Sequence, residues 1–140
     1  MIKDFIDKWD KNKKYLVNYF KTHKQEDYDS YEKIVKALFK YVINKDINVD
    51  FEKYDLSKIT IIDDGSYSGT QIFILHKDDY VPSLEEYVYT SNYYGSCSGC
   101  DTLYSISGYD FDEYPTESQL DQYTTLALHL LQKCNYFKEE

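Results

Sequence analysis

Two cysteines in a loop of small residues, Cys97 and Cys100, have the spacing that most clearly indicates chemistry in this sequence. A CxxC pair lets two thiolates converge on one atom, so it can hold zinc or form a redox disulfide. The same small side chains also pack well at a buried crossing, and a free cysteine is often buried. The pattern therefore leaves three interpretations open: a metal site, a redox site and a structural loop.

A zinc site needs two further ligands, and the candidates are one cysteine and three histidines: Cys134, His23, His76 and His129. In a helix, five residues turn about 500°, which places His129 and Cys134 roughly 140° apart and disfavours a shared metal. A three-cysteine site with His76 remains open. We expect no cofactor, and zinc held by Cys97 and Cys100 is the alternative.

For redox chemistry, a strand that runs into CxxC and then a helix is the thioredoxin-like order. Here the βαβ framework is missing and the charge of Asp101 opposes thiolate formation. Gly95 and Gly99 favour the structural interpretation, because glycine adopts backbone angles that other residues resist.

Two other groups of polar residues suggest weaker chemistry. The segment from Asp63 to Thr70 combines paired acids with hydroxyls, but it lacks the closing Glu of a calcium-binding loop and predicts a solvated hairpin turn. Glu117, Asp121 and His129 lie close in one predicted helix, without a Ser-His-Asp order, a P-loop or an HExxH motif. The sequence thus favours a protein that is not an enzyme.

Carboxylates alternate with aromatic rings in two segments of the second half of the chain. We predict a binding surface from Asp78, Asp79, Tyr80, Glu85 and Glu86 together with Tyr109, Asp110, Asp112 and Glu113. Tyrosine supplies hot-spot area at protein interfaces, and acids steer a basic partner. The alternative is a solvated face on a protein that contains 17 tyrosines.

Charge is divided unevenly along the 140 residues. The net charge is −9, with +2 in residues 1–60 and −11 in residues 61–140, and all 16 basic residues are lysine. Arginine is the usual bidentate reader of guanine and phosphate. Direct binding to nucleic acid is therefore not expected, whereas a basic protein partner is.

Hydrophobic periodicity predicts the elements that position these residues. Helices are expected at 2–22, at 30–44 with Asp29 and Glu32 as a capping box, at 102–107, and at 117–135 with Thr116 and Gln119 as a second capping box. Strands are expected at 59–62, 71–75 and 86–94, and residues 45–58 are ambiguous. The order predicts a single α+β domain over 1–140: an N-terminal helical hairpin, a three-stranded antiparallel meander, and a C-terminal helix packed on the sheet.

Three cysteines make an odd number, which fits reduced thiols better than a disulfide framework. No apolar run approaches the roughly 18 residues of a membrane span, and acids interrupt the first residues. We expect a cytoplasmic protein with no membrane association; the oligomeric state stays open.

The loop formed by Tyr94, Gly95, Cys97, Gly99, Cys100 and Asp101, with its serines, reads YGSCSGCD. The chain here resembles a group of uncharacterised proteins from bacteriophages and Gram-positive bacteria that carry this core. The likeness extends over roughly residues 59–134, including Asp64–Thr70 and Tyr123–Leu130. The resemblance implies a phage or prophage origin, and so a host-cell cytoplasm as the location, but it implies no activity.

These observations lead to one leading hypothesis and two alternatives. The first is a non-enzymatic, phage-type binding or inhibitor protein whose acidic, tyrosine-rich surface engages a basic host protein, for example one that binds nucleic acid. The first alternative is a small zinc- or thiol-dependent enzyme or sensor centred on the CxxC loop. The second is a protein that binds a small molecule such as a nucleotide signal, which requires a pocket.

Overall fold

In the computed structural model, which describes residues 1–96, 99, 101–110 and 112–137, an amphipathic helix opens the chain. This helix, α1, covers Lys3–Thr22. Phe5, Trp9, Leu16 and Phe20 are buried along one side, while lysines and aspartates occupy the other, as the periodicity predicted. A 3-10 turn, η1 (Gln25–Tyr28), then buries Tyr28 against Phe20.

The second predicted helix is divided into two parts. The α-helix α2 covers Tyr31–Leu38, and a π-helical turn, η2, continues it over Phe39–Ile43. The N-cap is Ser30, whose Oγ accepts a hydrogen bond from the Lys33 N–H over 3.2 Å. The prediction of Asp29 as N-cap is therefore wrong, and Asp29 instead forms an ion pair with Lys33 at 2.8 Å.

The ambiguous segment at 45–58 contains two 3-10 turns, η3 (Asp50–Glu52) and η4 (Leu56–Lys58), and no strand. Tyr54 is buried between them. The Asn44 side chain bonds both the N–H and the carbonyl of Tyr54, at 3.0 and 3.1 Å, and so ties this segment to the end of η2. An isolated antiparallel bridge also joins Tyr54 to Lys77, where the Asp55 N–H donates to the His76 carbonyl and the Asp78 N–H donates to the Lys53 carbonyl, both over 2.8 Å.

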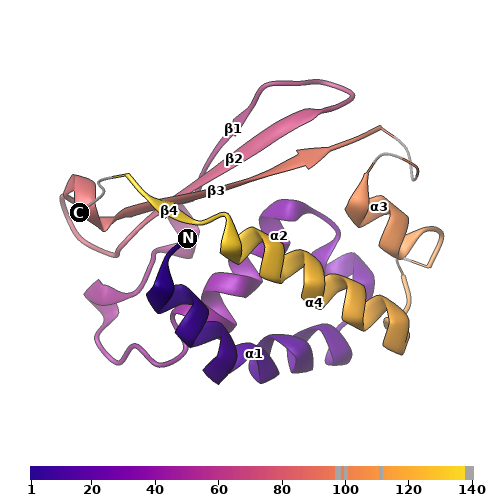
Figure 1. The fold of residues 1–140 in the computed structure, drawn as a ribbon, viewed down its shortest axis with the longest axis horizontal. Helices are drawn as coiled ribbons and strands as arrows, with labels where there is room; N and C mark the ends of the chain where they lie inside the picture. The colour runs from indigo at the N-terminus through magenta and orange to yellow at the C-terminus, as the bar shows by residue number, and fades with distance from the viewer. Residues whose placement is uncertain (97–98, 100, 111, 138–140) are drawn as a thin grey trace.

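Four strands form one antiparallel sheet in the order β1-β2-β3-β4 (Figure 1). They are β1 (Thr60–Asp63), β2 (Gly69–His76), β3 (Tyr87–Tyr94) and β4 (Asn135–Tyr136). The first three form the predicted meander, with a 3-10 turn, η5 (Leu84–Glu86), before β3. The register pairs Ile74 with Tyr89 and Thr90 with Phe73, so side chains of β2 and β3 form rows across the sheet.

The fourth strand corrects the prediction of three. The last helix, α4 (Glu117–Gln132), ends earlier than expected, and the chain turns at Lys133 to pair Tyr136 with Val88 of β3. The capping box of Thr116 and Gln119 at the start of α4 is confirmed. The short helix predicted at 102–107 is also present as α3 (Thr102–Ser107).

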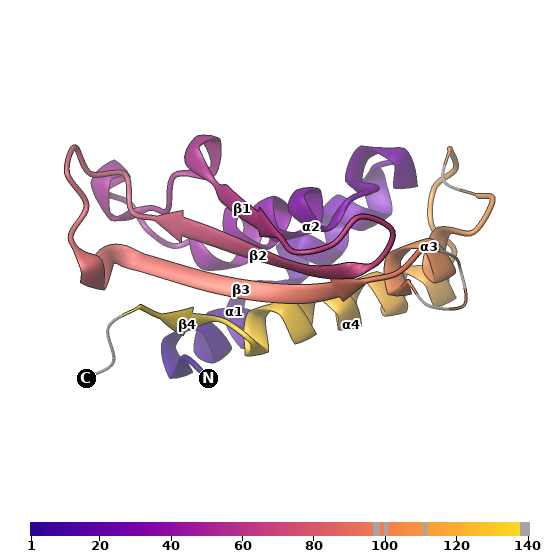
Figure 2. The ribbon, with the colours of Figure 1, turned by 90° about the horizontal axis from the view of Figure 1, so that it is seen from above.

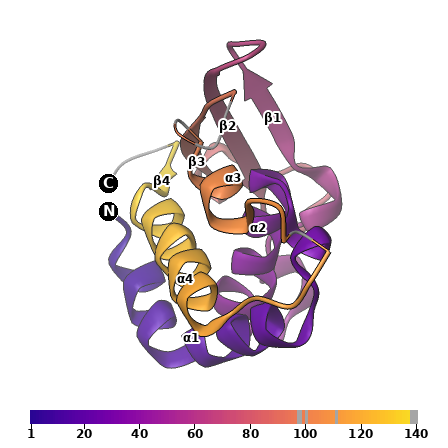
Figure 3. The ribbon, with the colours of Figure 1, turned by 90° about the vertical axis from the view of Figure 1, so that its right-hand side faces the viewer.

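All the α-helices lie on one side of the sheet (Figure 3). Phe73, Leu75 and Val88 point from β2 and β3 into the core beneath. The Thr90 hydroxyl, also on this inner face, donates to the Leu130 carbonyl over 2.7 Å and fixes α4 under β3. No helix in the described part of the chain is long and apolar enough to cross a membrane.

Candidate protein-binding surface

The CxxC motif is described only at its flanks, because Cys97 and Cys100 lie outside the described residues. Asp101 anchors the loop. Its Oδ1 accepts hydrogen bonds from the Tyr31 hydroxyl at 2.7 Å and the Gly95 N–H at 3.2 Å, and its Oδ2 accepts one from the Tyr104 N–H at 2.9 Å. Asp101 therefore caps α3 and joins the loop to α2, a structural task for the acidic residue of the motif.

The other candidate zinc ligands are dispersed in the structure. Cys134 is fully buried, and its Sγ donates to the Leu130 carbonyl over 3.5 Å. His129 is exposed on α4, His76 lies at the end of β2, and His23 contacts Tyr19 at the end of α1. Within the described ranges, no three His, Cys, Asp or Glu side chains are grouped so that they could hold a metal ion.

Burial makes Cys134 an inert thiol. Loss of solvation raises its pKa to about 12, so the nucleophilic thiolate is scarce at neutral pH. We expect iodoacetamide to leave Cys134 unmodified in the folded protein and to modify it in 6 M guanidinium, as checked by peptide mass spectrometry. Rapid native alkylation of Cys134 would contradict this placement.

The turn between β1 and β2 uses its carboxylates internally. Asp64 Oδ1 accepts a hydrogen bond from the Thr70 N–H at 2.7 Å, and Asp63 Oδ1 accepts one from the Gly65 N–H at 3.0 Å. The loop is so tight that a Cβ on Gly65 would lie 1.9 Å from the Ser68 carbonyl oxygen. These contacts favour the hairpin-turn interpretation over a cation site.

His129 and Asp121 line a groove of about 360 Å³ between α3 and α4. They are eight residues apart on one helix, a rise of about 12 Å, so they cannot share a proton directly. This groove gives no support to an acid–base pair.

The predicted acidic and aromatic residues are separated into two groups. Asp78, Asp79, Tyr80, Glu85 and Glu86 lie in the connection between β2 and β3, at one end of the sheet. Tyr109, Asp110, Asp112 and Glu113 lie between α3 and α4, beyond the other end of β3. An eight-residue strand spans about 26 Å, so these nine residues do not form one continuous surface.

The second acidic group belongs to the helical layer. The Gln25 side chain is buried, and its Nε2 donates to the Asp110 carbonyl at 2.9 Å, while the Gln25 N–H donates to the Glu113 carbonyl at 2.9 Å. The Tyr123 hydroxyl in turn donates to Gln25 Oε1 at 2.6 Å. These bonds fasten the loop beside η1, away from the open side of the sheet.

The outer face of the sheet is a candidate binding surface that sequence reasoning missed. Seen from above, the strands lie in front of the helices, and no element formed by the described residues covers them (Figure 2). Alternation and register place twelve residues on this outer face: Thr60, Ile62, Thr70, Ile72, Ile74, His76, Tyr87, Tyr89, Ser91, Tyr93, Asn135 and Phe137.

Seven of the twelve outer-face residues are Ile, Tyr or Phe, and none of the twelve described positions holds Asp, Glu or Lys, in a chain that is 29% charged. Ile62, Tyr93 and Phe137 expose 50%, 56% and 43% of their surfaces. The Phe137 ring contacts the rings of Tyr87 and Tyr89 at centroid distances of 5.8 and 5.1 Å. An open antiparallel sheet normally presents polar side chains to water, so a contiguous apolar face indicates an interaction site.

The two ends of the sheet carry carboxylates and are called here the acidic ends. At one end Asp63 lies on the inner side of the sheet by register, where the Tyr94 hydroxyl donates to its Oδ1 over 2.6 Å and holds the pKa of that carboxyl below its usual range. At the other end, hydrogen bonds from Ser83, first from its backbone N–H, lower the pKa of Glu86. Every ion pair in the described part of the chain has both of its residues within the range 8–58. Lysines of the helical layer therefore form no described ion pair with the carboxylates at these ends.

Comparison with models of protein families, with curated proteins and with solved structures found no match to this chain.

Proposed function

We propose that the protein is a binding module whose uncharged outer sheet face docks a basic protein. The observation that carries the proposal is the outer face itself, twelve residues without an acid or a lysine, between two acidic ends. The core of a protein interface is depleted in charge and enriched in aromatic residues, and its rim is polar. The outer face and its ends have this arrangement.

The area of the outer face indicates that the acidic ends also contact the partner. The longest strands span about 26 Å, and four strands lie about 4.8 Å apart, which gives the outer face an area on the order of 400 Å². A stable interface buries about 800 Å² on each partner. A docked protein must therefore extend beyond the apolar centre onto loops such as the one containing Asp78 and Asp79.

Charge distinguishes a basic partner from a second copy of this chain. Two copies packed face to face would bring acidic ends of the same sign together, in a molecule of net charge −9. A basic partner instead places cations against the acidic ends, and its lysine or arginine side chains can stack on Tyr89 or Tyr93. The phosphate-binding groove of a nucleic-acid-binding protein has this chemistry.

Capture from cell lysate at 50 mM and 500 mM NaCl, followed by mass spectrometry and a Kd measurement with the purified partner, tests the proposal. We expect a basic partner whose affinity falls by about tenfold or more at the higher salt, because the acidic ends are screened. Salt-insensitive capture, or capture of an acidic protein, would contradict the proposal.

A charge-matched pair of variants locates the acidic contact. Asp78→Asn with Asp79→Asn removes two charges beside the outer face, and we expect about three- to tenfold weaker binding, mainly from slower association. Asp110→Asn with Asp112→Asn removes the same charge from the loop beside η1 and is expected to leave the Kd unchanged. Equal losses in both variants would show that only the net charge matters.

A further inference from the structure

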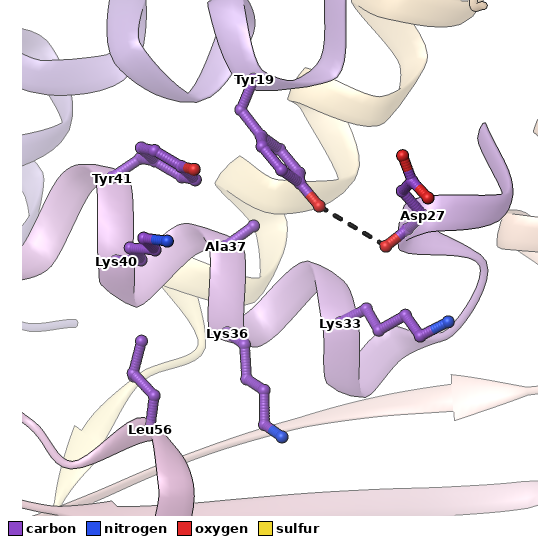
Figure 4. Close-up of a pocket in the computed structure, with 8 residues that line it drawn as sticks. All are labelled: Tyr19, Asp27, Lys33, Lys36, Ala37, Lys40, Tyr41 and Leu56. Carbon is purple, nitrogen blue, oxygen red and sulfur yellow. Dashed lines mark hydrogen bonds between the residues drawn. The ribbon is translucent and has the colours of Figure 1, made fainter. Parts of the chain in front are cut away.

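A pocket of about 290 Å³ lies on the opposite, helical layer and is independent of the outer sheet face. Helix α2 forms its floor, with the nearly buried Ala37 at the centre (Figure 4). Tyr19 and Asp27 stand on one side of α2, and Leu56 of η4 stands on the other. The volume is near the lower end of the range for small-molecule sites.

The π-helical turn η2 shapes one wall of the pocket. It carries Lys40 and Tyr41, both of which line the pocket. The Tyr41 ring stacks on Tyr19 with centroids 5.0 Å apart and planes 26° apart. The Tyr19 hydroxyl donates to the Asp27 carbonyl over 3.5 Å, which limits the movement of this aromatic wall. π-turns are rare and recur at functional sites, so this distortion of the helix is informative.

Three lysines border the same space: Lys33, Lys36 and Lys40. Lys33 and Lys36 form ion pairs with Asp29 and Glu32, both at 2.8 Å, and all four side chains are 38–49% exposed. Solvent screening makes exposed pairs of this kind weak, so these two ammonium groups can be redirected toward a ligand at small cost. The Lys40 ammonium has no carboxylate partner among the described ion pairs and lies 5.3 Å from the centre of the Tyr41 ring.

The pocket combines lysine cations, an aromatic wall and an apolar floor. This combination favours a ligand that has both an aromatic ring and a negative charge. We infer that this pocket binds a small aromatic anion with the chemistry of a mononucleotide. The base lies against Tyr41, Ala37 and Leu56, and the phosphate accepts hydrogen bonds from Lys36 and Lys40. Asp29 and Glu32 pair with two of the three lining lysines, so the ammonium without a carboxylate partner among the described ion pairs is that of Lys40. An anionic phosphate is drawn to this ammonium rather than to the acidic ends of the sheet.

Titration of the ¹⁵N-labelled protein with AMP, adenosine and inorganic phosphate tests this inference. We expect AMP to shift the amide signals of residues 33–41 and 56 with a Kd on the order of 0.1–1 mM. Adenosine supplies only the ring and phosphate only the charge, so each should bind at least about tenfold more weakly. Phosphate that binds these residues as tightly as AMP, or AMP that shifts none of them at 5 mM, would overturn the inference.

Two variants assign the contacts, and a third serves as control. Lys40→Gln should weaken AMP about tenfold and leave adenosine unchanged, because it removes one charged hydrogen bond. Tyr41→Leu should weaken both ligands. Lys45 also stacks on a tyrosine, Tyr15, at 4.4 Å, but does not line the pocket, so Lys45→Gln should have no effect. An equal loss in Lys45→Gln would show unspecific attraction to lysines and overturn the inference.

Discussion

Replacing Ile74 and Tyr89 with threonine is expected to weaken the complex with the basic partner about a hundredfold. The two residues are register partners near the centre of the outer face. Central aromatic and aliphatic contacts contribute about 1–2 kcal/mol each when they act as hot spots, and about 1.4 kcal/mol corresponds to a tenfold change in Kd. Threonine keeps the strand propensity of the branched and aromatic residues that it replaces. Calorimetric titration with the captured partner measures the effect.

The matched control for this variant changes two tyrosines elsewhere. Tyr109 and Tyr114 expose 93% and 58% of their surfaces in the loop between α3 and α4. Tyr109→Thr with Tyr114→Thr should retain the affinity of the unmodified protein. Far-ultraviolet circular dichroism must show that both variants are folded. A folded Ile74→Thr, Tyr89→Thr protein with an unchanged Kd would show that the outer face does not bind the partner.

Asp101→Ala is expected to lower the free energy of unfolding by about 3 kcal/mol. The change removes the N-cap of α3, about 1 kcal/mol, and leaves the Tyr31 hydroxyl without its acceptor, which adds about 2 kcal/mol. Tyr31 is only 5% exposed, so water replaces the lost bond poorly. Urea denaturation followed by tryptophan fluorescence of Trp9 measures the change.

A double-mutant cycle with Tyr31→Phe separates the loss of the hydrogen bond between Asp101 and Tyr31 from a nonspecific loss of stability. The Tyr31 hydroxyl also accepts a hydrogen bond from the Leu103 N–H at 3.0 Å, so it links α2, the motif loop and α3. We expect a coupling free energy of about 1–2 kcal/mol between Asp101 and Tyr31. Additive effects, or an Asp101→Ala protein as stable as the original, would show that the motif aspartate does not hold the loop.

The parts of the fold that follow from local pattern could be predicted from sequence. The stripe of Phe5, Trp9, Leu16 and Phe20 predicts α1 because a helix of that length has one core-facing side. The capping box at Thr116 predicts the start of α4 because both of its hydrogen bonds are local. A two-residue strand such as β4 carries no periodicity, and its pairing with β3 depends on contacts distant in sequence.

The candidate binding surface depends on tertiary structure, which explains why sequence reasoning found only the acidic residues at its ends. Ile72, Phe73 and Ile74 are consecutive apolar residues, a pattern typical of a strand buried on both faces. The register places Ile72 and Ile74 on the side opposite the buried Phe73, and in the described part of the chain no second layer lies above β2 on that side. Asp110 and Asp112 were grouped with the interface by composition, whereas the hydrogen bonds of Gln25 place their loop beside the helices.

Photo-crosslinking from the outer face shows whether the basic partner docks there. A benzophenone amino acid is placed at Ile72 and, as the matched control, at Tyr109, and each protein is irradiated with the captured partner at 50 mM NaCl. We expect an adduct with a lysine- and arginine-rich segment of the partner from position 72 and none from position 109. An adduct from position 109 alone, or adducts from position 72 only with a second copy of this chain, would contradict it.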